Sequence, residues 1–224
     1  MEKFILLAHH PDKAKFIVSE LQINYGMVGA MFLKLSFEEK IDIRDGKLIV
    51  RDRHEISNPH ASELVRMIVD SGRSKEIKYW ISKFGNKARP VREKVMEGLQ
   101  RKGVLSLEKK KALWLFPYTK SRVKARSTRE SLVSEMLRKA LSPKALSADD
   151  TIILALIESC KMHHALTSDK GEIRELKSTL KKILADSPVA STLDQTVQEV
   201  QTAILVSIIA TTSATMAATS VSSS

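Results

Sequence analysis

The chain has 224 residues, enough for one large domain or two small ones. It is 43% hydrophobic and 28% charged, a composition typical of a soluble protein with a buried core, and its formal net charge of +11 indicates a polyanionic partner. A single cysteine, Cys160, excludes a disulfide framework. We expect Cys160 to be a buried apolar residue in a reducing compartment.

The positive charge is concentrated in the middle of the chain. Residues 73–144 contain 21 Lys and Arg against 6 Asp and Glu, whereas the rest of the chain is slightly acidic. Such a one-sided block attracts nucleic acid, an anionic membrane face or phosphorylated head groups. The residues inside the block must distinguish these partners.

The N-terminal part predicts helices around one hairpin. Gly26 and Gly29 lie three residues apart in a segment with helical spacing, so we expect a neighbouring element to pack closely against that face. Apolar runs on both sides of Asp45-Gly46 predict a β-hairpin over 41–50. Two further segments have helical spacing, 61–69 and 77–84.

The next helix, 89–102, has clear boundaries. Pro90 suits the first helical position because its missing N–H costs nothing there, and Gly103 suits the position after the last turn. A second hairpin follows in our prediction, with strands 104–107 and 112–116 and a turn at 108–111.

The C-terminal part is predicted to be helical. Ser127 and Glu130 have the spacing of a capping box. Further helices are expected at 151–166, 172–184 and 192–210. Residues 200–224 carry no charge, but 11 of these 25 residues are Ser or Thr, so we expect a buried core helix and not a membrane span. The prediction is a mainly α, multi-helical single domain around this apolar C-terminal helix, with two β-hairpins, over residues 1–214. Residues 215–224 are expected to form a disordered tail.

No pattern indicates catalysis. His9-His10 and His163-His164 are adjacent pairs whose side chains diverge, and the motifs of zinc sites, serine hydrolases and nucleotide-binding loops are missing from the sequence. We therefore assign no catalytic residue, no metal site and no cofactor, and expect a protein that is not an enzyme.

Arg89 and Arg92 form the best candidate site. They lie on one face at a helix N-terminus, where unpaired N–H groups and the helix dipole favour an anion. Two guanidinium groups there could bind a phosphate, and the double substitution to alanine is expected to weaken binding without changing the thermal melt. The residues leave open a second interpretation, in which both arginines are solvated and paired with carboxylates such as Glu93.

The second hairpin is the other unusual feature. Its run Ala112–Phe116, with Trp114, Leu115 and Phe116, has no polar alternation, so it packs on the core, on a partner subunit or on a membrane interface. Lys109, Lys110 and Lys111 at the expected tip favour an anionic membrane surface. A winged helix–turn–helix is the alternative, with 89–102 as the DNA recognition helix and 104–116 as the wing.

Three stretches resemble the Golgi phosphoprotein 3 family: the run that begins Gly26-Met-Val-Gly, the segment Tyr79-Trp80-Ile81, and above all Ala88–Leu105. The resemblance covers roughly residues 2–214. It implies an α-rich peripheral membrane adaptor that binds phosphatidylinositol 4-phosphate through a basic pocket and uses the second hairpin for oligomerisation and membrane contact. Eukaryotic members hold the short cytosolic tails of Golgi glycosyltransferases.

Carried onto this chain, the resemblance implies that Arg89 and Arg92 are pocket residues and that Trp114, Leu115 and Phe116 belong to the apolar hairpin. Two pocket positions depart from the family. Val28 replaces an arginine, and the upstream pocket tryptophan has no counterpart, for which Phe16 or Tyr25 are candidate substitutes.

The acidic and arginine-rich N-terminal extension of the eukaryotic proteins is also missing. We therefore expect a shorter, bacterial-type member whose lipid is a different anionic one. The expected location is the cytosolic face of a membrane, with a homo-oligomer and membrane-protein tails as further partners.

Overall fold

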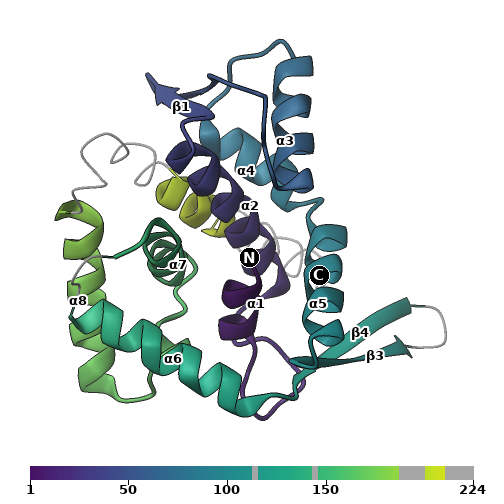
Figure 1. Ribbon diagram of the computed structural model, residues 1–224, viewed down its shortest axis with the longest axis vertical. Helices are drawn as coiled ribbons and strands as arrows, with labels where there is room; N and C mark the ends of the chain where they lie inside the picture. The colour runs from purple at the N-terminus through teal and green to yellow at the C-terminus, as the bar shows by residue number, and fades with distance from the viewer. Residues whose placement is uncertain (113–115, 143–145, 187–199, 210–224) are drawn as a thin grey trace, which may run out of the picture.

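Helix α2 (Glu20–Phe37) lies at the centre of the fold and packs against α1, α3, α4, α5 and α7 (Figure 1). The computed structural model describes residues 1–112, 116–142, 146–186 and 200–209. Within these residues the protein is mainly α with two small antiparallel hairpins, which confirms the predicted fold class. The other helices are α1 (Glu2–Ala8), α3 (Pro59–Asp70), α4 (Ile77–Gly85), α5 (Arg89–Arg101), α6 (Arg126–Leu141), α7 (Ala148–Ser159), a 3-10 turn at His163–Ala165, α8 (Lys170–Asp186) and a helix over residues 200–209.

Helix α2 begins at a capping box. The side chain of Ser19 accepts a hydrogen bond from the backbone N–H of Gln22, and the side chain of Gln22 accepts one from the backbone N–H of Ser19. These reciprocal bonds satisfy two of the backbone donors that a helix start leaves unpaired. Beyond the first turn, α2 is buried on nearly every side, as expected for a helix that other helices surround.

The close approach predicted for Gly26 and Gly29 is confirmed. A Cβ atom on Gly29 would lie 2.4 Å from Cδ1 of Ile204, in the helix at residues 200–209, and one on Gly26 would lie 2.9 Å from Sγ of Cys160. The neighbours are side chains that occupy the space a larger residue would need. Cys160 is fully buried, as predicted, and burial raises the pKa of its thiol to about 12.

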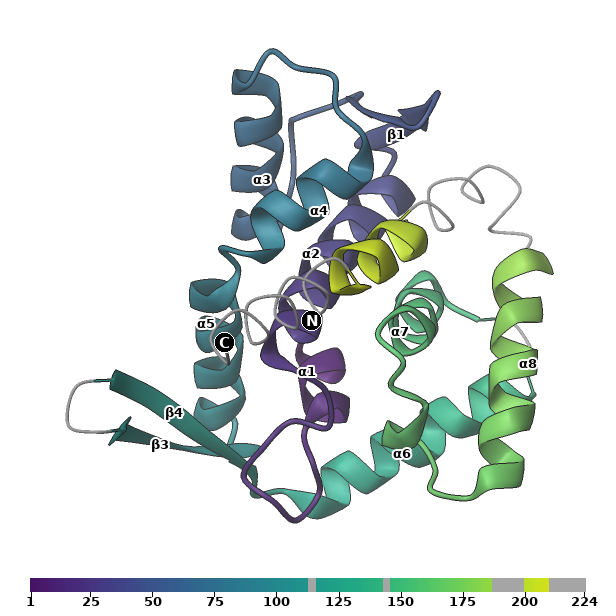
Figure 2. The same ribbon diagram turned by 180° about the vertical axis from the view of Figure 1, so that it is seen from behind.

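The helix at residues 200–209 lies across α2 and buries one face (Figure 2). Val200 and Ile204 are fully buried, whereas Val206 and Ile209 are 45% and 62% exposed. In the described part of the chain, no helix combines the length and the apolar character needed to cross a bilayer. The expected tail at 215–224 lies outside the described residues.

The first hairpin was predicted correctly. Strands β1 (Ile41–Arg44) and β2 (Lys47–Val50) pair in antiparallel register across Asp45 and Gly46. Both turn residues have positive φ angles, 51° and 71°, as the tight hairpin turn requires.

The second hairpin differs from its prediction. Its strands, β3 (Leu105–Ala112) and β4 (Phe116–Val123), are longer than expected, and Ala112 pairs with Phe116. The lysines at 109–111 therefore belong to a strand, not to the turn. Pro117 lies within β4, beyond the expected strand end at residue 116, because in a two-stranded sheet both strands are edges and tolerate a missing N–H.

The predicted capping box at Ser127 is also wrong. Helix α6 begins earlier, at Arg126, without a side-chain cap. In the first turn of α6, Arg129 is buried and donates from Nε to the carbonyl oxygen of His9 and from Nη2 to that of Leu7. These bonds satisfy carbonyl groups at the end of α1 and hold the first turn of α6 against it.

Two glycines on neighbouring helices are expected to respond oppositely to alanine. At Gly85 a Cβ would lie 2.0 Å from Cδ1 of the buried Tyr25 ring, so Gly85→Ala should lower the free energy of unfolding by about 1–3 kcal/mol. At Gly98 the nearest atom would lie 3.5 Å away, so Gly98→Ala should raise it by about 0.5–1 kcal/mol through reduced backbone entropy. Urea unfolding of both variants measures the difference. Equal effects at the two positions would contradict this packing.

Candidate anion-binding site

The site is built on the N-terminus of α5, which carries both predicted arginines. Ala88, not Arg89, is the N-cap residue, and it provides no side-chain cap. Arg89 and Pro90 are therefore the first two helical residues, one position earlier than predicted. The first turn contains no acidic residue, so the positive end of the helix dipole stays uncompensated within α5.

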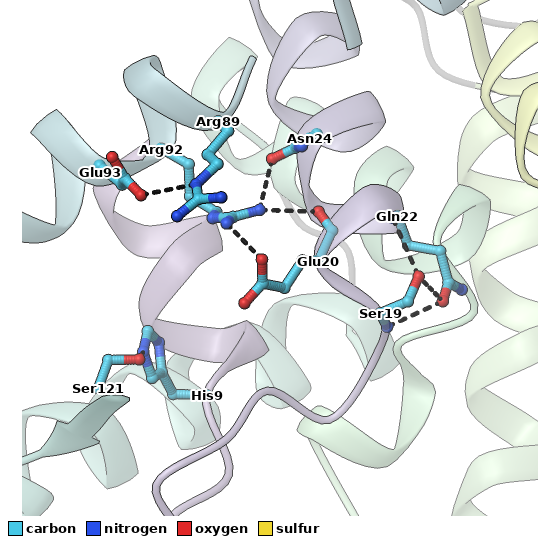
Figure 3. A network of polar contacts seen from close by, with 9 residues as sticks. All are labelled: His9, Ser19, Glu20, Gln22, Asn24, Arg89, Arg92, Glu93 and Ser121. Carbon is cyan, nitrogen blue, oxygen red and sulfur yellow. Dashed lines mark hydrogen bonds and ion pairs between the residues drawn. The ribbon is translucent and has the colours of Figure 1, made fainter. Parts of the chain in front are cut away.

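Arg92 is almost completely buried, at 3% exposure, and fastens α5 to the start of α2 (Figure 3). Its Nη1 donates to the backbone carbonyl of Glu20 at 3.2 Å and to Oδ1 of Asn24 at 2.8 Å. Its Nη2 donates to the carboxylate of Glu20 at 2.5 Å. Among the described residues, Nε of Arg92 has no hydrogen-bond partner.

Arg89 is exposed and has a different environment. Its side chain is 57% accessible, and its Nε donates to Oε1 of Glu93, one turn along α5, at 2.9 Å. The carboxylate of Glu93 raises the pKa of the Arg89 guanidinium, with a smaller contribution from Glu20. Glu20 therefore acts electrostatically on both arginines.

The structure brings Arg89 and Arg92 to the same end of α5 but does not make them equivalent. Arg89 presents its guanidinium to solvent, whereas Arg92 presents only the edge that the Glu20 carboxylate occupies. An anion at this helix end could contact Arg89 directly, and could contact Nη2 of Arg92 only in place of Glu20. Both arginines are paired with carboxylates, as the second interpretation of this pair expected, but only Arg89 is also solvated, because Arg92 is buried.

Glu20 and Asn24 were missed by the sequence analysis. They lie four residues apart and so share one face of α2. This spacing, directly after the Ser19 capping box, was the sequence signal that could have placed both side chains on one face at the start of the helix. Their distance from Arg92, 72 and 68 residues along the chain, concealed the contact.

At the positions that depart from the family, Val28 and Tyr25 are buried and Phe16 is half-buried. Val28 is buried inside α2, at 1% exposure. Tyr25 is equally buried and donates its hydroxyl hydrogen to Oδ1 of Asn86, just before α5. Phe16 packs against the ring of His9, with the ring centres 4.3 Å apart. Tyr25 is thus the nearer of the two candidate substitutes to Arg89, but its ring supports α4 and does not face solvent.

The β3/β4 hairpin projects from the body at the other end of α5 (Figure 1). Lys109 and Lys110 are exposed on β3, and so are Lys120 and Arg122 on β4. Lys111 and Phe116 lie in the strands, while Trp114 and Leu115 lie outside the described residues. A cavity of about 440 Å³ lies between α5 and the hairpin.

A buried histidine anchors the base of this hairpin. His9 is 0% exposed, with Nδ1 2.7 Å from the carbonyl oxygen of Ile5 and Nε2 2.8 Å from Oγ of Ser121 on β4. A carbonyl oxygen can only accept, so Nδ1 carries the proton and Nε2 accepts from the Ser121 hydroxyl. Burial lowers the pKa of His9 to about 4, and this neutral tautomer agrees with that shift.

His9 predicts a specific acid sensitivity. Between pH 6.5 and about 4 the unfolded chain binds a proton at His9 that the folded chain does not, so stability should fall as the pH is lowered through this window. The whole effect is roughly 3 kcal/mol. Urea unfolding across this range should show a smaller loss for His9→Asn than for the unmodified protein. Parallel pH profiles would contradict the assignment.

The two arginines should differ in stability measurements, which revises the expectation that their joint removal leaves the melt unchanged. Arg92→Ala leaves the buried Asn24 amide without its partner and should lower the free energy of unfolding by about 1–3 kcal/mol. Arg89→Ala removes an exposed pair and should change it by less than about 0.5 kcal/mol. Thermal melts of the two variants provide the comparison. Equal melting temperatures for Arg92→Ala and Arg89→Ala would show that the hydrogen bonds of Arg92 to α2 contribute little to stability.

Among the described residues, no group of three or more His, Cys, Asp or Glu side chains could hold a metal ion. A search of curated proteins gives no significant match. The family model described as Golgi phosphoprotein 3 (GPP34) matches residues 1–200, nearly the whole chain. The protein therefore belongs to the Golgi phosphoprotein 3 family.

Proposed function

We propose that the protein is a non-enzymatic peripheral membrane adaptor that binds anionic phospholipid head groups through Arg89 and Arg92. Membership of the Golgi phosphoprotein 3 family supports an adaptor of this type. The observation that carries the proposal is the exposed guanidinium of Arg89 at an uncapped helix N-terminus, beside a second arginine. Backbone N–H groups, the dipole and the guanidinium all favour an anion there.

The hairpin supplies a second basic region in this proposal. It follows α5 directly, so the arginines and the hairpin are separated by one helix of 13 residues, about 20 Å. A membrane surface is wide enough to contact both, and the exposed lysines of β3 would add attraction to anionic lipid. Self-association through the hairpin, the holding of membrane-protein tails and a place on the cytosolic membrane face are parts of the proposal that follow from the family resemblance.

DNA binding by a winged helix–turn–helix is the second candidate. The basic α5 and the basic hairpin favour it. Against it, α5 turns Arg92, Met96 and Leu99 inward, which leaves few side chains on the N-terminal half of the helix that could reach base edges. The family match also favours the lipid.

Vesicle sedimentation tests the proposal. The protein should sediment with phosphatidylcholine vesicles that contain phosphatidylglycerol or phosphatidylinositol 4-phosphate, and not with phosphatidylcholine alone. Arg89→Ala should weaken the association about fivefold, because one basic residue near an anionic leaflet contributes about 1 kcal/mol.

Arg66→Ala is the matched control. Arg66 is likewise an exposed helical arginine paired with a glutamate of its own helix, Glu63 on α3, and its removal changes the net charge equally. It should leave vesicle binding unchanged. Equal losses in the two variants would show that only net charge matters, and tighter binding to short duplex DNA at physiological salt would favour the winged-helix function.

A further inference from the structure

Glu20 occupies the only edge of Arg92 that an incoming anion could contact. Its carboxylate accepts from Nη2 of Arg92, and Asn24 together with the backbone carbonyl of Glu20 holds Nη1 (Figure 3). The same carboxylate also contributes negative potential at the guanidinium of Arg89. A negative group therefore already lies between α5 and α2, where the proposed function requires the negative charge of a phosphate.

The two partners of this ion pair differ greatly in accessibility. The side chain of Glu20 is 62% exposed, whereas that of Arg92 is 4% exposed. Glu20 can therefore turn into solvent by rotation of its own side chain, without opening the core. Arg92 would keep both bonds from Nη1, so its guanidinium would stay in place after Glu20 leaves. The carboxylate of Glu20 can therefore leave while the guanidinium of Arg92 stays in place.

Glu93 does not have this property to the same degree. It pairs with Arg89, which is itself exposed at 57%, so water already screens the interaction and Arg89 keeps donors free for a ligand. Of these two described ion pairs, it is therefore the pair of Glu20 with Arg92 in which the carboxylate blocks a guanidinium donor from a ligand.

We propose that Glu20 is an internal competitor of the anionic head group, and that its displacement sets how much anionic lipid a membrane must contain before the protein binds. This inference rests on the proposed function. A carboxylate tethered to the same chain competes at high effective concentration, so a sparse anionic surface does not displace it and a dense one does. The half-maximal point of binding should therefore lie at a higher anionic lipid content than it would without Glu20.

The test compares Glu20→Gln and Glu20→Ala with Glu63→Gln, in full-length protein. Glu63 is an exposed glutamate paired with Arg66 on α3, so its substitution raises the net charge by the same amount without touching the site. The probe is phosphatidylcholine vesicles with increasing phosphatidylglycerol. Glu20→Ala should bind about tenfold more tightly than the unmodified protein, because the variant lacks one charge-assisted hydrogen bond that competes with the lipid. It should also need less anionic lipid for half-maximal binding. Glu20→Gln should shift in the same direction, and Glu63→Gln should change affinity by less than about twofold.

Arg92→Ala, alone and combined with Glu20→Ala, completes the cycle. Without Arg92, removal of Glu20 should give a smaller gain, because the competitor then has no guanidinium to release. Thermal melts confirm that each variant is folded. If the unmodified protein binds but both Glu20 variants bind no better, or less well, Glu20 positions Arg92 and the competitor role is wrong. If no form binds anionic vesicles, the proposed function itself fails and takes this inference with it.

Discussion

The arrangement of the basic region depends on the guanidinium of Arg92, which is buried between two helices. A buried cation is costly unless its donors are paired, and Nη1 and Nη2 of Arg92 make three hydrogen bonds to the first turns of α2, while its buried Nε has no partner among the described residues. Those bonds fix where α5 begins relative to the central helix. Since Arg89 is three residues away on α5 and the hairpin follows directly after it, their positions depend on the same contact.

This arrangement limits what the site can do. A guanidinium that holds two helices together cannot also give all its donors to a ligand. Nη1 is committed to α2 and Nε is enclosed, which leaves Nη2 and the exposed group of Arg89. The site therefore suits a single anionic group that approaches from outside, and it does not enclose a whole ligand. Affinity for a membrane would then come from several weak contacts, the hairpin lysines among them.

Local signals were sufficient for much of the fold. Asp45-Gly46 predicted the first hairpin, and Gly103 has the positive φ angle, 71°, that is expected after a helix. The spacing of Gly26 and Gly29 predicted a closely packed helix face. Each of these depends on backbone geometry within a few residues. The spacing of Arg89 and Arg92 likewise placed both at one helix end.

Contacts between residues that are far apart in the chain could not be predicted from the sequence. Spacing shows that two arginines share a side of a helix, but which of them the core covers depends on Glu20 and Asn24, far away in the chain. The first turn of α6 also depends on a distant contact, because Arg129 donates to carbonyl groups of α1, and the capping-box pattern at Ser127 does not reveal it. The lysines at 109–111 were assigned to a turn because charged runs are common there. Pairing with β4 decides otherwise, and no local pattern reveals it.

The placement of those lysines in a strand has a consequence for solubility. A ribbon of two strands leaves both outer edges unpaired, and such edges tend to join those of other copies. Strands that joined would lie about 4.8 Å apart, inside the Debye length of about 8 Å at physiological ionic strength, so salt would weaken the repulsion between their ammonium groups only in part. The positive charge thus disfavours edge-to-edge stacking into larger sheets, so the self-association proposed for the hairpin would have to use its faces and not its outer edges.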